Sequence, residues 1–350
     1  MAYKILILGA SYGSLLGTKL LMAGHDVTLV CRSATARLIN AEGTEVRISL
    51  KGEDTHRAIR SGDLPGHLDA MTPEQVKPGD YDLICLAMQE PQYCAHEIWT
   101  LMVRIADARV PCLSIMNMPP LSYLKRIGGL DTRALESSYT NPRVWDRFDP
   151  ELMTLCSPDP QAFRPPEEGA NVLHVGLPTN FKAARFGDAR QNEMLRRLEA
   201  DIDAVRLDGK DVPVKLRVYD SLFVPLAKWS MLLTGNYRCI TDAAPISIRD
   251  AVHTDIERSR KIYTAVDALT AKLGADPADA VPFGKYAKAA ENLLKPSSAA
   301  RAIDAGAPFI ERVDLLVSTI AKSLGMENAE FTHITETVDA QLKNNHRQIA

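Results

Sequence analysis

The chain has 350 residues, which is enough for two domains that each bury their own core. Its net charge of −3 excludes a strongly basic nucleic-acid binder, and its apolar stretches are too short for a membrane span or a signal peptide, so we expect a cytoplasmic protein with neither partner. The six cysteines lack C-x-x-C spacing, which favours buried thiols in a reducing compartment and no metal site.

Residues 4–32, KILILGASYGSLLGTKLLMAGHDVTLVCR, predict a strand, a glycine-containing turn, a helix and a second strand. Both strands are continuous apolar runs, which is typical of a parallel sheet covered on both faces. The N-terminus of a helix in this context binds the pyrophosphate of a dinucleotide. Arg32 follows the second strand, where NAD-binding folds usually have a carboxylate. Its guanidinium instead suits the extra phosphate of NADP(H), and Arg37 offers a second positive charge.

The glycines of this turn depart from the G-x-G-x-x-G pattern. Gly9 and Gly13 are present, but Ser11 and Ser14 stand where the strict pattern has glycine. We interpret the turn as one residue shorter than usual, with Gly13 allowing the helix to pack closely on the strand. Backbone N–H groups near Tyr12 and Gly13 would then contact the phosphates, helped by the two serine hydroxyls. The alternative is a strand-to-helix turn that binds no ligand.

Alternating strands and helices continue the doubly wound α/β pattern as far as residue 117. We expect strands at 45–50, 81–87 and 110–117 and helices at 36–41 and 94–106. In such sheets the ligand lies beyond the carboxyl ends of the strands, which places Asn117 at the cofactor. The alternative is that Asn117 only forms the turn before Pro119 and Pro120.

Residues 138–168 are rich in Ser, Pro, Asp and Arg, yet they include Trp145 and Phe148. A loop of this length is usually functional or disordered, and its aromatic residues favour an ordered lid or a dimer contact. Strands at 171–175 and 183–186 and a helix at 191–204 should complete a first domain of residues 1–219. Residues 220–350 then form a second, wholly helical domain.

The second domain begins with a predicted helix that carries Lys228 and Asn236. Eight residues apart, these side chains project within about 80° of each other on an α-helix. The apolar neighbourhood would lower the pKa of Lys228 toward the range useful for proton transfer, unless a phosphate or a carboxylate offsets this effect. The alternative is that Lys228 extends to the surface and has no catalytic role.

The remaining helices of the second domain are expected at 246–273, 286–294 and 309–324. The first of them has a regular apolar stripe and no residue that demands chemistry. Ser297 and Ser298 follow a proline, and their sequence context first indicates a helix N-cap.

These features together resemble the ketopantoate reductase family, NADPH-dependent enzymes that reduce 2-dehydropantoate and share a fold with 6-phosphogluconate dehydrogenase-like proteins. The resemblance covers most of the chain. It rests on the opening motif, on Asn117, on Lys228 and Asn236 in the helix pattern K-x-x-x-N-x-x-x-N, and on Ser297 and Ser298 ahead of DAGAPFIERVDLLVSTIAKSLGM. It implies that Lys228 donates a proton to the carbonyl oxygen, while the asparagines and Ser298 hold the substrate.

Several positions depart from the family pattern. Leu232 stands where the family has its first helix asparagine, and Ala87 where it has a lysine after the fourth strand. The family's active-site glutamate falls on Ile310, so Glu311 takes its role only through a one-residue shift. Residues 142–164 look like an insertion. Loss of a substrate-binding asparagine costs about 1–3 kcal/mol, so we expect a substrate other than ketopantoate.

We therefore expect an NADPH-dependent reductase of a 2-oxo acid or related carbonyl compound, in which hydride passes to the carbonyl carbon. One alternative is an NADP(H)-binding redox sensor without turnover, which the missing polar groups favour. Another is an opine-dehydrogenase-like enzyme, which would need a His–Asp pair that the second domain does not offer. The expected partner is a small oxo acid, and the long helices are compatible with a homodimer.

Overall fold

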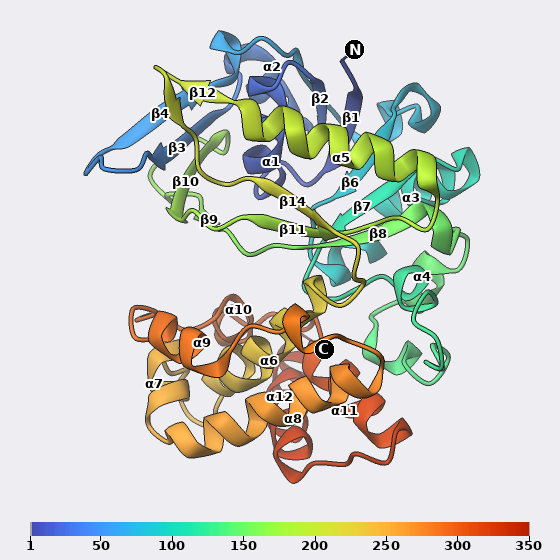
Figure 1. The fold of residues 1–350 in the computed structure, drawn as a ribbon, viewed down its shortest axis with the longest axis vertical. Helices are drawn as coiled ribbons and strands as arrows, with labels where there is room; N and C mark the ends of the chain where they lie inside the picture. The colour runs from blue at the N-terminus through green and yellow to red at the C-terminus, as the bar shows by residue number, and fades with distance from the viewer. Residues whose placement is uncertain (1, 350) are drawn as a thin grey trace. The chain divides into compact units, whose positions relative to one another are not determined.

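The structure is a computed structural model that describes residues 2–349 and contains two compact units (Figure 1). Within the described residues, unit 1 comprises 2–88, 92–126 and 143–220, and unit 2 comprises 89–91, 127–142 and 221–349. The main division follows Asp220. Two segments that we assigned to the first domain, 89–91 and 127–142, thus belong to unit 2.

Unit 1 is built on an eight-stranded, mainly parallel sheet. Its strand order is β14 (Leu216–Tyr219), β11 (Phe181–Ala184), β8 (Met153–Ser157), β7 (Cys112–Ile115), β6 (Leu83–Leu86), β1 (Lys4–Leu8), β2 (Asp26–Val30) and β5 (Leu68–Met71). Neighbours from β8 to β5 are parallel, and β11 runs antiparallel to β8. The apolar run from Ile5 to Leu8 is completely buried, as expected for a central strand. The predicted Rossmann-type sheet is confirmed.

Five α-helices accompany this sheet, and α5 lies across it in Figure 1. They are α1 (Gly13–Met22), α2 (Ser33–Glu42), α3 (His96–Ala108), α4 (Leu121–Leu124) and α5 (Ala189–Ala204). A second sheet has the order β4 (His56–Arg60), β3 (Glu45–Ser49), β10 (Val172–Leu177) and β9 (Gln161–Phe163), and β12 (Arg206–Leu207) pairs with β13 (Lys210–Asp211). The pairing of β3 with β10 was not predicted because its strands lie far apart in the sequence.

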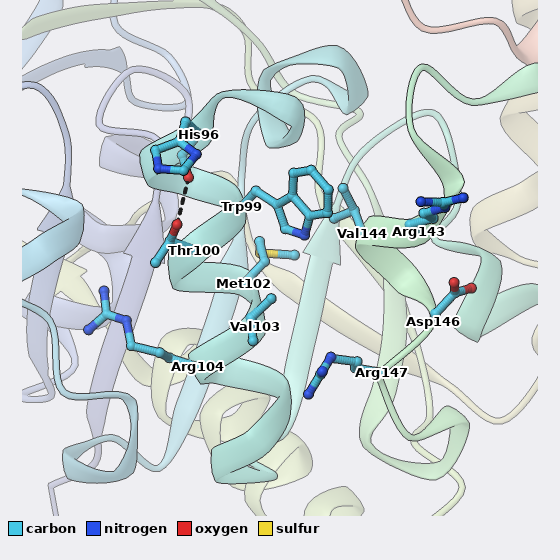
Figure 2. A pocket seen from close by; sticks show the side chains of 10 residues that line it. All are labelled: His96, Trp99, Thr100, Met102, Val103, Arg104, Arg143, Val144, Asp146 and Arg147. Carbon is cyan, nitrogen blue, oxygen red and sulfur yellow. Dashed lines mark hydrogen bonds between the residues drawn. The ribbon is translucent and has the colours of Figure 1, made fainter.

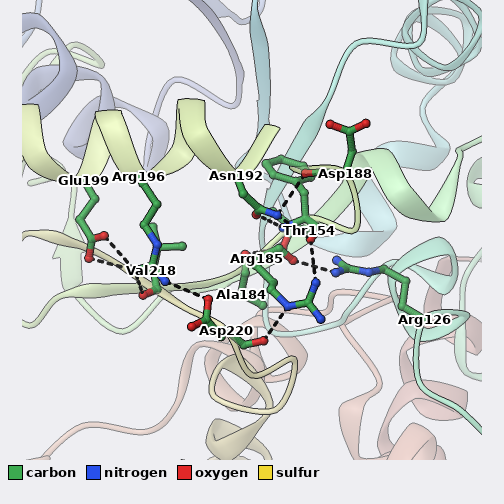
Figure 3. Close-up of polar contacts among 11 residues, drawn as sticks. Arg126, Thr154, Ala184, Arg185, Asp188, Asn192, Arg196, Glu199, Val218 and Asp220 are labelled. Atoms are coloured by element: carbon green, nitrogen blue, oxygen red, sulfur yellow. Dashed lines mark hydrogen bonds and ion pairs between the residues drawn. The ribbon is translucent and has the colours of Figure 1, made fainter. Parts of the chain in front are cut away.

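Arginine side chains hold the β14 edge of the main sheet (Figure 3). Arg196, on α5, donates to the carbonyl of Val218 at 2.6 Å and forms an ion pair with Asp220 at 3.0 Å. Arg185 donates to the carbonyl of Asp220 at 3.0 Å, and Arg126 donates to the carbonyl of Arg185 at 2.8 Å. These bonds anchor the last residues of unit 1 to the sheet and to α5.

Within residues 138–168, where we expected an ordered lid or a dimer contact, the structure places Trp145 and Phe148 in the interior, so these two aromatic residues do not form a lid. Strand β8 lies inside this segment, is buried along its whole length and pairs with β7 and β11. Trp145 is fully buried and packs edge-on against Tyr93, with ring centroids 5.4 Å apart. The apolar residues from 144 to 157 therefore belong to the core of unit 1.

Unit 1 also buries a lysine. Lys19, on α1, is 2% exposed, and its Nζ donates to the carbonyls of Val212 and Pro213, both at 3.1 Å. Burial, together with the neighbouring ammonium of Lys215, lowers the pKa of Lys19 from 10.5 to about 7. The positive charge of Arg206 also lowers the pKa of Lys19, whereas the negative charges of Asp211 and Asp203 raise it.

Because the pKa of Lys19 is lowered in the folded protein, we expect the free energy of unfolding to depend on pH. Between about pH 7 and pH 10.5 the unfolded chain binds more protons at Lys19 than the folded chain does, so the free energy of unfolding rises with pH. The cost of burying the charge is fully present below that window. Relative to Lys19→Met, the wild type should gain up to about 1.4 kcal/mol per pH unit within it. Urea unfolding at about pH 6, 8 and 9.5 measures this difference. A difference that stays constant across the three pH values would contradict the prediction.

In its described residues unit 2 contains helices and no strand, as predicted. Its α-helices are α6 (Lys228–Met231), α7 (Ile248–His253), α8 (Ile256–Lys272), α9 (Phe283–Ala290), α10 (Ser298–Asp304), α11 (Val313–Ser323) and α12 (Ala329–Ile349). The single helix expected at 246–273 is wrong. The helix is interrupted at Asp255, whose φ of −139° is not helical. The Asp255 side chain caps the start of α8 by accepting from the Arg258 N–H at 2.9 Å. Helix α12 was not predicted.

The composition of the chain led us to expect no membrane span, no metal site and buried cysteines, and residues 2–349 can be compared with each of these expectations. No helix in this range is long and apolar enough to cross a lipid bilayer. No group of three or more His, Cys, Asp or Glu side chains is placed there to hold a metal ion. Four cysteines are buried as expected, whereas Cys31 and Cys94 are only half-buried.

Candidate active-site residues

The turn after β1 is closely packed against the ends of two neighbouring strands. Gly9 has a φ of +107°, which disfavours any residue with a side chain. Its N–H donates to the carbonyl of Val30, at the end of β2, at 3.1 Å. A Cβ at Gly9 would lie 2.6 Å from the carbonyl oxygen of Ala87, just after β6. The turn therefore lies at the carboxyl ends of β1, β2 and β6, where the sequence predicts the dinucleotide.

Gly13 has the packing role predicted for it. A Cβ at this position would lie 2.5 Å from Cγ2 of Ile7, so a larger residue would push α1 away from β1. Two of the expected phosphate contacts are bonded within the turn instead. The Gly13 N–H donates to the carbonyl of Gly9 at 3.1 Å, and the buried Ser14 hydroxyl donates to the carbonyl of Ala10. The Ser11 side chain is exposed.

Tyr12 joins this turn to the chain that follows β8. Its hydroxyl donates to the carbonyl of Pro160 at 2.6 Å, and its ring packs edge-on against Phe181. Burial and the nearby Cys156 and Asp159 raise the pKa of the Tyr12 hydroxyl far above its usual value. The phenol therefore stays protonated and able to donate to Pro160.

Arg32 and Asn117 both follow strands of the main sheet, as expected. Arg32 comes two residues after β2, is exposed and directly precedes α2. Asn117 comes two residues after β7 and is half-buried. Because β7, β6, β1 and β2 are parallel neighbours, both residues lie at the same edge of the sheet as Gly9.

In unit 2, the helix predicted to carry Lys228 and Asn236 is irregular. A 3-10 turn at Pro225–Ala227 leads into α6, which continues as a π-helix at Leu232–Asn236 and a 3-10 turn at Tyr237–Cys239. Lys228 is half-buried and is the first residue of α6. Since a π-helix winds less per residue than an α-helix, the angle of about 80° derived for a uniform helix does not apply.

Tyr286 explains the π-helix. Its hydroxyl donates to the carbonyl of Met231 at 3.1 Å, and in an α-helix that carbonyl would accept from the N–H of residue 235. A Cβ at Gly235 would lie 2.1 Å from the same hydroxyl, so only glycine leaves room for it. An inserted side chain is an established cause of helix distortion, and π-helical turns are frequent at functional sites.

The two serines ahead of α10 have different environments. Ser297 is the N-cap of α10: its hydroxyl accepts from the Ala300 N–H at 3.1 Å and donates to the carbonyl of Asn236 at 2.7 Å. This side chain is buried, whereas that of Ser298 is exposed. The hydrogen bond of Ser297 thereby attaches the start of α10 to the backbone of Asn236. Ser298 is the next residue, the first of α10, and does not take part in that bond.

Glu311 belongs to the same network. The Tyr237 hydroxyl donates to the carbonyl of Glu311 and accepts from the Val313 N–H at 3.0 Å. Since Tyr237 directly follows Asn236, the bonds of Ser297 and Tyr237 connect two of the four site residues predicted in this unit, Asn236 and Glu311, through their backbone carbonyls. The Glu311 carboxylate is nearly buried and accepts from the N–H of Glu90 at 3.3 Å.

Sequence reasoning missed Glu90. It is 1% exposed, and its carboxylate accepts from the hydroxyl of Thr140 at 2.8 Å and from the Thr140 N–H at 3.1 Å. Burial raises its pKa, and the bonds from Thr140 act against this. The available signal was an acidic residue four positions after a buried strand, which ends at Leu86. The backbone of Glu90 orients Glu311, while its side chain anchors residues 89–91 to the 127–142 segment.

A cavity in unit 1 contains none of the predicted site residues (Figure 2). It measures about 600 Å³ and lies between α3 and residues 143–147. Trp99, Met102, Val103 and Val144 give it an apolar lining, with arginines and Asp146 at its margin.

Comparison with known proteins agrees with the resemblance stated from the sequence. Residues 5–95 match the model of the family Ketopantoate reductase PanE/ApbA, which confirms that resemblance over the strands and turn described above. A sequence comparison with curated proteins found no match.

Solved structures resemble the chain over nearly its whole length. D-mandelate dehydrogenase with NADH and anilino(oxo)acetate is 16% identical, with 98% of this chain and 99% of that chain covered and a TM-score of 0.65. The 2-dehydropantoate 2-reductase from Methylococcus capsulatus is 12% identical, with 98% of this chain and 97% of that chain covered and a TM-score of 0.67. A dimeric ketopantoate reductase from Staphylococcus aureus is 10% identical, with 98% of this chain and 99% of that chain covered and a TM-score of 0.58. At these identities the likeness shows the fold.

Proposed function

We propose that this protein is an NADPH-dependent reductase of a 2-oxo acid or related carbonyl compound. The observation that carries the proposal is the turn at Gly9, which lies at the carboxyl ends of three parallel strands inside the region that matches the ketopantoate reductase family. This is the position at which doubly wound folds bind dinucleotides.

The residues at this edge of the sheet fit a nicotinamide dinucleotide. Because Gly9 has no side chain, the backbone can approach a pyrophosphate closely, and the exposed Ser11 hydroxyl can donate to it. Tyr12 and Gly13 position the start of α1, and Asn117 lies where its amide can contact the cofactor. Arg32 favours NADP(H) over NAD(H) because its guanidinium complements a 2′-phosphate.

In the proposed reaction, the bound cofactor supplies hydride to the carbonyl carbon of the substrate. Lys228 donates a proton to the carbonyl oxygen as negative charge develops on it. Asn236 and Ser298 hold the substrate by hydrogen bonds to its oxygen atoms. The Glu311 carboxylate, oriented by the Glu90 N–H, accepts a hydrogen bond from a hydroxyl of the substrate or product.

Leu232 makes ketopantoate itself a poor candidate substrate. This side chain is buried in the π-helix, at the position where the family has an asparagine, so it offers no hydrogen bond. A 2-oxo acid with an apolar side chain avoids an unpaired polar group there. The D-mandelate dehydrogenase structure, which contains anilino(oxo)acetate, suggests aromatic 2-oxo acids among the first compounds to test. We also propose a homodimer, as in the Staphylococcus aureus reductase.

The absence of polar groups at Leu232 and Ala87 keeps a cofactor-binding sensor as the second candidate. An opine-dehydrogenase-like mechanism has less support, because no histidine in the described residues of unit 2 forms an ion pair with a carboxylate. The only pairs described for histidine lie in unit 1, at His25, His67 and His174.

A cofactor oxidation assay tests the proposal. Purified protein is mixed with NADPH or NADH and a panel of 2-oxo acids with short, branched or aromatic side chains, and absorbance is followed. We expect NADPH to be consumed with at least one of these compounds, and consumption to stop when the oxo acid is omitted. Tight binding of NADPH without consumption across the whole panel would favour the sensor.

A further inference from the structure

A second arginine lies in the neighbourhood of Arg32 and comes from a distant part of the chain. The Tyr12–Pro160 hydrogen bond places residue 160 against the glycine turn, and the Gly9–Val30 bond places that turn beside the end of β2. Strand β9 follows Pro160 directly and ends at Phe163. The next residue, Arg164, lies near enough to Arg32 for the positive charge of Arg32 to act on its guanidinium.

Neither guanidinium is neutralised by the protein. Among residues 2–349, the side chains of Arg32 and Arg164 form no ion pair and no hydrogen bond. Arg164 is also half-buried. Burial lowers its pKa, and the neighbouring positive charge of Arg32 lowers it further. Proteins seldom leave a partly buried charge unpaired beside a like charge, because desolvation and repulsion then add.

An anion that binds both arginines would remove this cost. A phosphate monoester is a suitable ligand, since it carries between about one and a half and two negative charges near pH 7 and offers three acceptor oxygens. The end of the second strand is where doubly wound folds bind the adenosine ribose of a dinucleotide. The pyrophosphate lies elsewhere, at the start of α1.

We propose that Arg164, together with Arg32, binds the 2′-phosphate of NADP(H) and so determines the choice of cofactor. This inference rests on the proposed function only in so far as the chain binds a nicotinamide dinucleotide. It assigns a role to the end of the segment that looked like an insertion in the sequence: this segment supplies the second half of a phosphate site.

Equilibrium titrations with NADPH and with NADH, followed by cofactor fluorescence, test the proposal. The proteins are the wild type, Arg164→Gln, Arg32→Gln and a control, Arg190→Gln, whose side chain is exposed on α5 and makes no described contact. Loss of one charge-assisted phosphate contact should raise the Kd for NADPH about tenfold or more in the first two variants. The Kd for NADH should change less than about twofold, and the control should match the wild type. Thermal unfolding of each variant shows whether it is folded.

Each other result has a defined meaning. If Arg164→Gln weakens NADPH and NADH equally, the side chain contacts the shared part of the dinucleotide and the proposal is overturned. If Arg32→Gln alone weakens NADPH, Arg164 has no part in the site, while the proposed reductase function still stands. If the folded wild type binds neither cofactor, both this inference and the proposed function are wrong.

Discussion

Replacing Lys228 with alanine should lower kcat by about 10²–10⁴-fold while the Kd for NADPH changes less than about twofold. The proposed reduction places negative charge on the carbonyl oxygen, and a positioned proton donor contributes on this scale. Lys228 is half-buried at the start of α6, about one helical turn before the buried Leu232–Gly235 segment. Its removal should leave the glycine turn of unit 1 unchanged, so cofactor binding should persist.

Steady-state kinetics and cofactor titration on the same preparation measure both quantities. Lys261→Ala is the matched control, because Lys261 is an exposed lysine on α8 with no described contact. It should retain wild-type kcat and Kd. Full activity of Lys228→Ala, or parallel loss of activity in both variants, would remove Lys228 from the proposed mechanism.

Replacing Arg312 with methionine should destabilise unit 2 by about 3–5 kcal/mol. Asp314 is completely buried, and Arg312 donates to its carboxylate through Nε at 3.0 Å and through a terminal nitrogen at 2.9 Å. Arg312 also pairs with Asp339 on α12 at 2.6 Å. Burial raises the pKa of Asp314, and Arg312 opposes that rise. Without Arg312, the Asp314 carboxylate would have to remain buried with no positive partner or take up a proton.

Urea unfolding followed by circular dichroism measures the loss. Arg249→Met is the control, since Arg249 pairs with Asp250 at 3.2 Å on the exposed surface, and an exposed pair contributes at most about 1 kcal/mol. The double variant Arg312→Met/Asp314→Leu should recover much of the stability because it removes the unpaired charge. Equal small losses in the two single variants would show that the buried network contributes no more than a surface pair.

The first strands and the glycine turn were predictable because their signals are local. An apolar run that is buried on both faces has the same pattern in any sequence, and Gly13 must be small because α1 crosses β1 there. Asn117 and Arg32 could be placed for a similar reason, since both follow strands whose carboxyl ends meet at one edge of the sheet.

Other features depend on residues that are distant in the sequence. β8 has Ser- and Pro-rich neighbours, and its place in the core depends on pairing with β7 and β11. The π-helix arises because the Tyr286 hydroxyl occupies the space beside Gly235. No periodicity near Lys228 indicates this contact.

The sequence by itself determined the fold class, the position of the glycine turn after β1 and the family resemblance, because burial periodicity and turn chemistry act over a few residues. Only the tertiary structure decided which distant groups meet. It brought the Glu90 N–H to the Glu311 carboxylate, and it placed Arg164 near enough to Arg32 for the charge of one to act on the other. Such pairs are set by the packing of whole strands and helices, and their energies depend on burial and on neighbouring charge, which a linear pattern does not contain.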